Sequence, residues 1–201
     1  MEYRTRDLLL RPAVRDDWEP MYRNLWRHAE SARWMFWEPS GSEEEARERI
    51  ERTIRFEKEH PLCFLVIRRD GGEAIGFAGM LEKEPGVYEE TGIALGPDFT
   101  GKGYGRQALA ALLALAFEER RAERFLCSNR AENVPSRRLQ EYFGFRWDHS
   151  EEREDPRNGA PFTMELRVMD REGYRLAAER VRALLDSERP GGARRVPPIR
   201  T

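Results

Sequence analysis

The stretch GPDFTGKGYGRQAL (96–109) places four glycines around Lys102, between a strand-like segment and an apolar, helix-like one. Glycines at a strand-to-helix turn allow successive backbone N–H groups and a helix N-terminus to approach an anion closely. The loop therefore predicts an anion-binding site. The glycines alone leave a second interpretation open, in which they only let the helix pack close to its neighbours.

Two nucleotide-binding motifs fit this loop in part. A Walker loop fits from Gly96 onward, but Gly103 stands where a Ser or Thr would bind Mg²⁺. A dinucleotide fingerprint fits from Gly103 to Ala108, but it belongs in a first strand–helix turn, with an acidic residue about 20 positions later. Here the loop follows predicted antiparallel strands, and the next strand ends in CSN. Both nucleotide-binding classes are therefore disfavoured.

A family resemblance accounts for the loop and its surroundings together. GIALGPDFTGKGYGRQAL, followed about thirty residues later by NRAENVPSRRLQEYFGF, resembles the GNAT acetyltransferase superfamily. RTRDLLLRPAVRDDW near the start, and Asn133-x-x-Ser136 leading into LQEYFGF, resemble its RimJ/RimL-like branch of protein N-terminal acetyltransferases. The resemblance spans roughly residues 5–170. It implies the GNAT fold and a loop that binds the pyrophosphate of acetyl-CoA without a metal ion.

The resemblance also implies which residues hold acetyl-CoA. Thr100 stands where the family commonly has Gln or Arg, so a longer or charged donor is missing, and Lys102 and Arg106 are expected to compensate. Asn133 is expected to bond the pantetheine arm, although the same side chain could instead cap the following helix. The implied cofactor site comprises Ile93, Ala94, Leu95, Thr100, Gly101, Lys102, Gly103, Tyr104, Gly105, Arg106, Asn133 and Ser136.

Acetyl transfer to an amine needs a base, a polarised carbonyl and a proton for the leaving sulfur. By resemblance, Glu90 in Glu90-Thr91-Gly92 is the expected base, with a solvated carboxylate or a substrate hydrogen-bond partner as the alternative. Backbone N–H groups of residues 93–95 are the expected carbonyl polarisers. The family attacks directly, without an acyl-enzyme, so neither cysteine is needed as a nucleophile.

The proton for the leaving sulfur has a less obvious source. Gln140 stands where many family members have a tyrosine acid, and the RimJ/RimL branch typically lacks that tyrosine too. Ser136 is then the residue nearest the sulfur. It is expected either to donate to the sulfur or only to bind the pantetheine arm.

The acceptor is expected to be an amine, on a protein N-terminus or on a small molecule such as an antibiotic, polyamine or amino acid. Trp34, Phe36 and Trp37 in RWMFWEP fall in the segment that walls the acceptor site of the family. They either line that site or form aromatic core between helices. An apolar wall would favour a peptide or amino-acid-like amine over an aminoglycoside. A coenzyme A-binding module without transferase activity is the alternative function.

Hydrophobic periodicity and turn residues predict an α+β (mixed α/β) protein, in which a mixed, mostly antiparallel sheet is flanked by helices. Short links at 71–72 and 84–86 predict hairpins, and one parallel βαβ step follows the glycine loop. Ser42, with Glu45 three residues on, predicts a helix start. The expected strands are 7–13, 62–70, 73–83, 87–96, 123–129, 145–153 and 161–169, and the expected helices are 15–31, 42–60, 104–121, 134–143 and 174–188.

Length and composition bound the remaining possibilities. The chain has 201 residues, 39% hydrophobic and 36% charged, with a net charge of −2, so it lacks the basic field that would predict a nucleic-acid or membrane partner. Its apolar run 108–117 is far shorter than the roughly 20 residues of a membrane helix. Cys63 and Cys127 are expected to be buried, reduced thiols in a cytoplasmic protein, and the scattered histidines predict no metal site.

The domain organisation expected from these features is simple. An acetyltransferase domain covers 1–170, an appended amphipathic helix covers 171–187, and a Pro/Gly/Arg-rich tail covers 188–201 and is expected to be disordered. The sequence leaves open whether the chain forms a homodimer.

Overall fold

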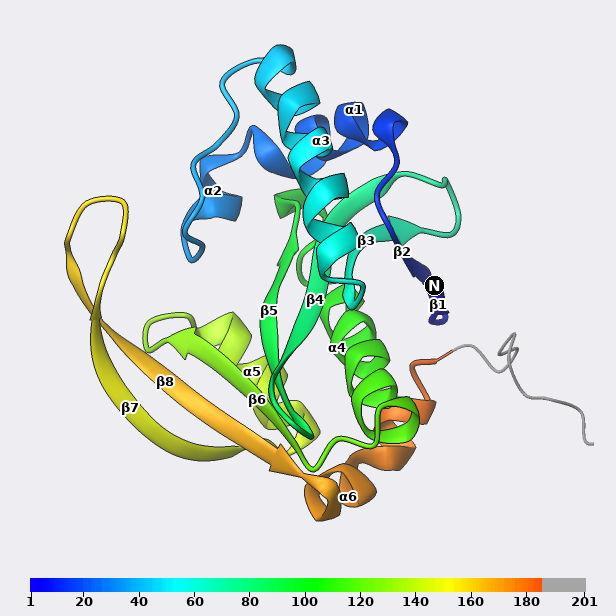
Figure 1. Cartoon of the computed structure of the whole chain (residues 1–201), viewed down its shortest axis with the longest axis vertical. Helices are drawn as coiled ribbons and strands as arrows, with labels where there is room; N and C mark the ends of the chain where they lie inside the picture. Colours follow the sequence, from blue (N-terminus) through cyan, green and yellow to red (C-terminus); the bar gives the residue numbers. More distant parts are fainter. Residues whose placement is uncertain (186–201) are drawn as a thin grey trace, which may run out of the picture.

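A computed structural model describes residues 1–185, so the predicted tail 188–201 lies outside the described residues. Its eight strands form one mixed sheet in the order β1-β2-β3-β4-β5-β6-β8-β7 (Figure 1). Only β5 and β6 pair in parallel, which confirms the predicted mostly antiparallel sheet with one βαβ step. The strands are β1 (Tyr3–Arg4), β2 (Leu8–Arg11), β3 (Cys63–Arg68), β4 (Ala74–Glu84), β5 (Val87–Leu95), β6 (Arg124–Arg130), β7 (Arg146–Glu154) and β8 (Pro161–Asp170).

The predicted helix over 15–31 is wrong as a single helix. It is divided into a 3-10 turn, α1 (Trp18–Met21), a π-helical turn and α2 (Ala29–Ala32). The Asp17 side chain bonds no amide of α1; its carboxylate accepts from the Arg11 guanidinium twice, at 2.7 Å, and from the Val14 amide at 2.8 Å. His28 then takes an extended conformation (φ −96°, ψ 118°) and ends the helical path.

The longer helices begin where the sequence predicts. α3 (Glu43–Glu59) is capped by the Ser42 hydroxyl, which accepts from the Glu45 amide at 3.2 Å. α5 (Val134–Phe143) has the predicted bounds. α4 (Tyr104–Ala114) is shorter than predicted as an α-helix, because its end unwinds into a π-helical turn. α6 (Arg171–Arg182) completes the described chain.

Two apolar clusters, on opposite faces of the sheet, form the core. The larger one packs the apolar face of α4 against β2–β5 and takes in Ala177 and Val181 of α6, so this C-terminal helix contributes to the main core. The smaller one packs α1 and α3 against the other face, around Trp26 and Ile50. Figure 1 shows α3 and α4 on either side of the central strands. No helix within residues 1–185 is long and apolar enough to cross a membrane.

The sheet separates into two halves between β5 and β6. The parallel ladder holds only three residue pairs, from Val87↔Arg124 to Glu89↔Leu126. Beyond Glu89, β5 continues along β4 to Leu95, while β6 continues along β8. The two strands diverge (Figure 1), so each has a backbone edge without a strand partner.

A β-bulge lies at the start of this divergence. Gly79 pairs with Gly92 and Met80 pairs with Glu90, so Thr91 is the extra residue in β5. Gly92 has φ +124°, a value that favours glycine. The bulge therefore redirects the side chains of β5 at the point where β6 leaves it.

Candidate active site

The glycine loop presents a run of free backbone donors. Within the described chain, no amide from Gly101 to Arg106 donates to a protein acceptor, and no side chain caps α4 at Gly103. Gly101 and Gly103 have φ of +72° and +84°, and a Cβ on either would meet nothing within 4 Å. These N–H groups are therefore without protein acceptors at a helix N-terminus, an arrangement that fits a pyrophosphate.

The side chains around this loop supply positive charge. Thr100 does not offer its hydroxyl outward, because the hydroxyl donates to the Pro97 carbonyl at 2.9 Å. Lys102 and Arg106 are exposed, and neither forms an ion pair with any residue in 1–185. Arg106 stacks on the Tyr142 ring at 4.3 Å. Two unpaired cations therefore stand where the sequence analysis expects them to compensate for Thr100.

The free edge of β5 supplies further donors, but not all those predicted. The Gly96 amide donates to the Ile75 carbonyl at 2.9 Å, toward β4. Amide directions alternate along a strand, so the Ala94 amide also faces β4, and those of Ile93 and Leu95 face the diverging side. The prediction that Ala94 supplies an amide to the substrate is therefore wrong, because β4 already uses it.

Glu90 lies at the end of the parallel ladder, next to Cys127 of β6. Burial raises the pKa of Glu90 to about 7, although hydrogen bonds from the Cys127 thiol and from the Gly92 and Ile93 amides partly oppose the rise. Glu89 points elsewhere and pairs with Lys83 at 3.5 Å. A carboxylate with a pKa near neutrality is suited to accept a proton from an amine.

Asn133 and Ser136 lie together at the start of α5. The Asn133 side chain accepts from the Ser136 amide at 3.2 Å, so it does cap this helix. The Ser136 hydroxyl accepts from the buried Gln140 amide at 3.1 Å. Because Gln140 occupies a lone pair, the hydroxyl proton of Ser136 is left to donate to another group.

A cavity of about 320 Å³ lies between α3 and strands β3–β5, on the face opposite α4. Its wall includes Thr91, the bulged residue of β5, whereas Glu90 pairs with Met80 of the larger cluster and faces the α4 side of the sheet. Its polar members on α3, Arg49 and Glu57, cannot be recognised in the sequence, because they resemble the solvated charges around them. Its lining residues include Trp26, Trp37, Arg49, Arg52, Glu57 and Thr91.

The three predicted acceptor-site aromatics have different surroundings. Trp37 lines the cavity and also packs on the smaller core cluster. Trp34 and Phe36 are not part of the cavity wall. Phe36 is 49% exposed and lies 6.0 Å from the Phe162 ring of β8. Of the three aromatics, only Trp37 both lines the cavity and packs in the core.

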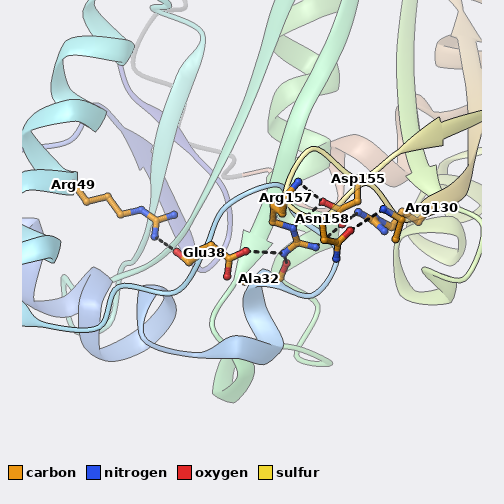
Figure 2. A network of polar contacts seen from close by, with 8 residues as sticks. Ala32, Glu38, Arg49, Arg130, Asp155, Arg157 and Asn158 are labelled. Atoms are coloured by element: carbon orange, nitrogen blue, oxygen red, sulfur yellow. Dashed lines mark hydrogen bonds and ion pairs between the residues drawn. The ribbon is translucent and has the colours of Figure 1, made fainter.

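A polar network joins the 32–38 segment to the β7–β8 turn (Figure 2). Arg157 contacts the Ala32 carbonyl at 3.4 Å and the Glu38 carboxylate at 3.8 Å. Asp155 is buried and binds Arg157 at 2.8 Å and Arg130 at 2.6 Å, and these guanidinium groups hold its pKa below the usual range. The sequence carries no signal of this network, because it joins segments more than a hundred residues apart.

The sheet opens between the parallel strands β5 and β6, and a run of free amides follows at the N-terminus of α4. Residues 7–146 match the acetyltransferase (GNAT) domain family, and the chain belongs to that family. The protein is a GNAT-type N-acetyltransferase.

Individual relatives agree with this assignment. The uncharacterized N-acetyltransferase YnaD of Bacillus subtilis (strain 168) is 28% identical over 148 residues, covering 73% of this chain and 83% of YnaD. A GCN5-related N-acetyltransferase from Brucella melitensis has a TM-score of 0.80 at 19% identity, over 91% of this chain and 84% of that one. Spermidine N-acetyltransferase from Vibrio cholerae, in complex with CoA and spermine, has a TM-score of 0.66 at 22% identity, over 84% of this chain and 98% of that one.

Proposed function

We propose that this enzyme moves the acetyl group of acetyl-CoA to a primary amine by direct attack. The observation that carries the proposal is the run of free amides from Gly101 to Arg106 directly after the strand that holds Glu90. One strand and its loop thus offer an anion site and a carboxylate with a pKa of about 7. The Vibrio cholerae relative, which has the same fold and holds CoA, supports the choice of cofactor.

Each residue has one role in this mechanism. Bound acetyl-CoA supplies the acetyl thioester. Glu90 accepts a proton from the attacking amine, and the Leu95 amide donates to the thioester oxygen, because the Ile93 amide already donates to Glu90. Ser136 donates toward the leaving sulfur. Lys102 and Arg106 add positive charge beside the pyrophosphate.

Direct attack is supported by the state of the two cysteines. Both Cys63 and Cys127 are buried and free. Burial raises the pKa of both thiols, and Glu90 raises that of Cys127 further. A thiol that stays protonated is a poor nucleophile, so an acyl-cysteine step is disfavoured. Two unlinked thiols also suit the reducing cytoplasm, where we place the enzyme.

The proposal also covers the family branch of the enzyme and the class of amine that it acetylates. The motif Asn133-x-x-Ser136 supports the RimJ/RimL-like branch, which would make a protein N-terminus one class of acceptor. Small amines form the other class, and the spermidine N-acetyltransferase shares the fold. The apolar wall around Trp37 favours a peptide or amino-acid-like amine over an aminoglycoside.

The test of the cofactor site uses acetyl-CoA binding by calorimetry in a buffer without Mg²⁺. Gly105 has an ordinary helical φ and its Cβ would lie 3.7 Å from Leu139, so Gly105→Val changes the cradle without backbone strain. We expect Gly103→Val and Gly105→Val to weaken binding by more than about tenfold. Gly159→Ala is the control, since Gly159 has a similar positive φ (+71°) far along the chain. Unchanged affinity in folded Gly103 and Gly105 variants would contradict the site.

The test of the reaction is acetyl-CoA turnover in a broad screen of amines and short peptides. Acetylation of at least one primary amine is expected. Acetyl-CoA binding without turnover across the screen would favour a coenzyme A-binding module instead.

A further inference from the structure

Cys127 is a buried thiol that faces Glu90 from the neighbouring parallel strand. The β5–β6 ladder ends at Glu89↔Leu126, so Glu90 and Cys127 occupy the next position, where the two strands begin to diverge. Cys127 is 1% exposed and belongs to the larger apolar cluster, as does Met80, the partner of Glu90 on β4. The Cys127 thiol donates a hydrogen bond to the Glu90 carboxylate, so this thiol joins the proposed base of β5 to β6.

On its other side, Cys127 meets a group that cannot take the thiol proton. Its cross-strand neighbour on β8 is Arg167, a buried guanidinium that carries hydrogen-bond donors only. Arg167 is itself bound to the Glu165 carboxylate at 2.9 Å and to the Asn129 side-chain oxygen at 3.1 Å. Burial raises the pKa of the Cys127 thiol well above its ordinary value, and the charge of Glu90 raises it further. The thiol therefore stays a protonated donor at neutral pH.

Three donors hold the Glu90 carboxylate. They are the Cys127 thiol and the backbone amides of Gly92 and Ile93. The two amides belong to the same strand as Glu90, whereas the thiol comes from the other half of the sheet. A carboxylate offers about four lone-pair sites, so these donors leave room for a proton from an amine. Glu90 retains some exposed surface and Cys127 is buried, so Cys127 can act on the reaction only through Glu90.

We propose that Cys127 is a positioning residue for the base, because its thiol holds the Glu90 carboxylate where the sheet opens. This inference rests on the proposed function, in which Glu90 accepts the amine proton. The other groups around the base act differently. Glu89 on the same strand disfavours the ionised form of Glu90 by like charge, Arg167 acts on Cys127, and Met80 on β4 is uncharged. A hydrogen bond to an ionised carboxylate lowers its pKa, so loss of the thiol should raise the pKa of Glu90.

The kinetics of Cys127 variants separate this role from a structural one. Cys127→Val keeps the site filled but removes the donor, and the acid limb of its kcat–pH profile should move up by about 0.5–1 pH unit. For a base of pKa about 7, this lowers kcat relative to wild type about three- to tenfold at pH 6 and hardly changes it at pH 9. Cys127→Ser retains a donor and should restore most of the wild-type profile. In a Glu90→Gln background, Cys127→Val should not move the profile.

The S–H stretching band of Cys127 tests the hydrogen bond without any turnover. The chain has two cysteines, so Cys63→Ser leaves Cys127 as the source of this infrared band. Hydrogen bonds to an ionised acceptor are stronger, so the band should lie at lower wavenumber when Glu90 is ionised. We expect it to move to higher wavenumber as the pH falls from 8.5 to 5.5, with a midpoint near the Glu90 pKa of about 7. Adding Glu90→Gln should abolish this movement. The measurement leaves Cys127 unchanged, so it stands even where Cys127 variants do not fold.

The contrary results are distinguishable. A band that does not respond to pH in the presence of Glu90 would overturn the inference and leave the proposed function standing. An equal fall in kcat at pH 6 and pH 9 in Cys127→Val would overturn it too, because that pattern indicates a structural role. Absence of acetylation of every amine would overturn the proposed function and the role of Cys127 with it, whatever the infrared band shows.

Discussion

Replacing Glu90 by glutamine tests whether this residue accepts the amine proton. Glutamine keeps the size of the side chain and its hydrogen-bonding oxygen, but it cannot accept a proton. Glu90 has a pKa raised to about 7 by burial, well above the ordinary value of 4.5. A general base supplies roughly 10²–10⁴ in rate, so Glu90→Gln should lower kcat by that factor while acetyl-CoA affinity stays similar.

The pH dependence of kcat gives a second, independent test of whether Glu90 is the base. The base must be ionised, and a group of pKa 7 goes from about one-eleventh ionised at pH 6 to about ten-elevenths at pH 8. The ratio of wild-type to Glu90→Gln kcat should therefore rise about tenfold over this interval. Taking the ratio cancels the titration of the acceptor amine, which both enzymes share.

The assay follows CoA release by thiol detection from pH 5.5 to 9, at saturating acetyl-CoA. Glu89→Gln is the matched control, since Glu89 is the adjacent carboxylate but pairs with Lys83 on the other side of the strand. Its kcat should stay close to that of the wild type. A Glu90→Gln enzyme with normal kcat across the whole range would refute the reasoning and leave Glu90 as an ordinary strand carboxylate.

Three further predictions concern the leaving group, the acceptor wall and stability. Ser136→Ala should lower kcat less than Glu90→Gln does and should weaken acetyl-CoA binding, both measurable by steady-state kinetics and calorimetry. Trp37→Ala should raise KM for the amine and leave acetyl-CoA affinity unchanged. Trp34→Ala should not raise it, because of these two rings only Trp37 lines the cavity. If the variants lose stability without a change in amine KM, the rings have only a structural role in the core. Burial raises the pKa of Glu57 from 4.5 to about 7 in the folded protein, so the folded state favours the protonated form. The protonated carboxyl therefore contributes its full stability to the fold below pH 4.5, and this stability is lost as the pH rises to 7. Denaturant titrations should therefore show Glu57→Gln gaining stability relative to wild type between pH 5 and 8, by about 1–3 kcal/mol, and no pH-dependent gain would contradict this.

The sequence alone determined the local features of this protein. Hairpins between β3, β4 and β5 follow from their short links, and the start of α3 follows from Ser42 and Glu45. The glycine loop was predictable for the same reason. Positive φ at Gly101 and Gly103, and free amides at a helix N-terminus, depend on residues that are neighbours in the chain.

The tertiary structure decided what depends on distant partners. Glu90 has its raised pKa because Cys127, on a strand that begins after α4, packs against it. The Ala94 amide is used by β4, which only the register shows. In the sequence, Arg49 is indistinguishable from the other charged residues of an Arg/Glu-rich helix. Only the tertiary structure shows that it stacks on Trp26 and Trp37 without a carboxylate partner among residues 1–185. Backbone preferences and turn chemistry act over a few residues, whereas burial, desolvation and charge pairing are set by segments that the fold brings together.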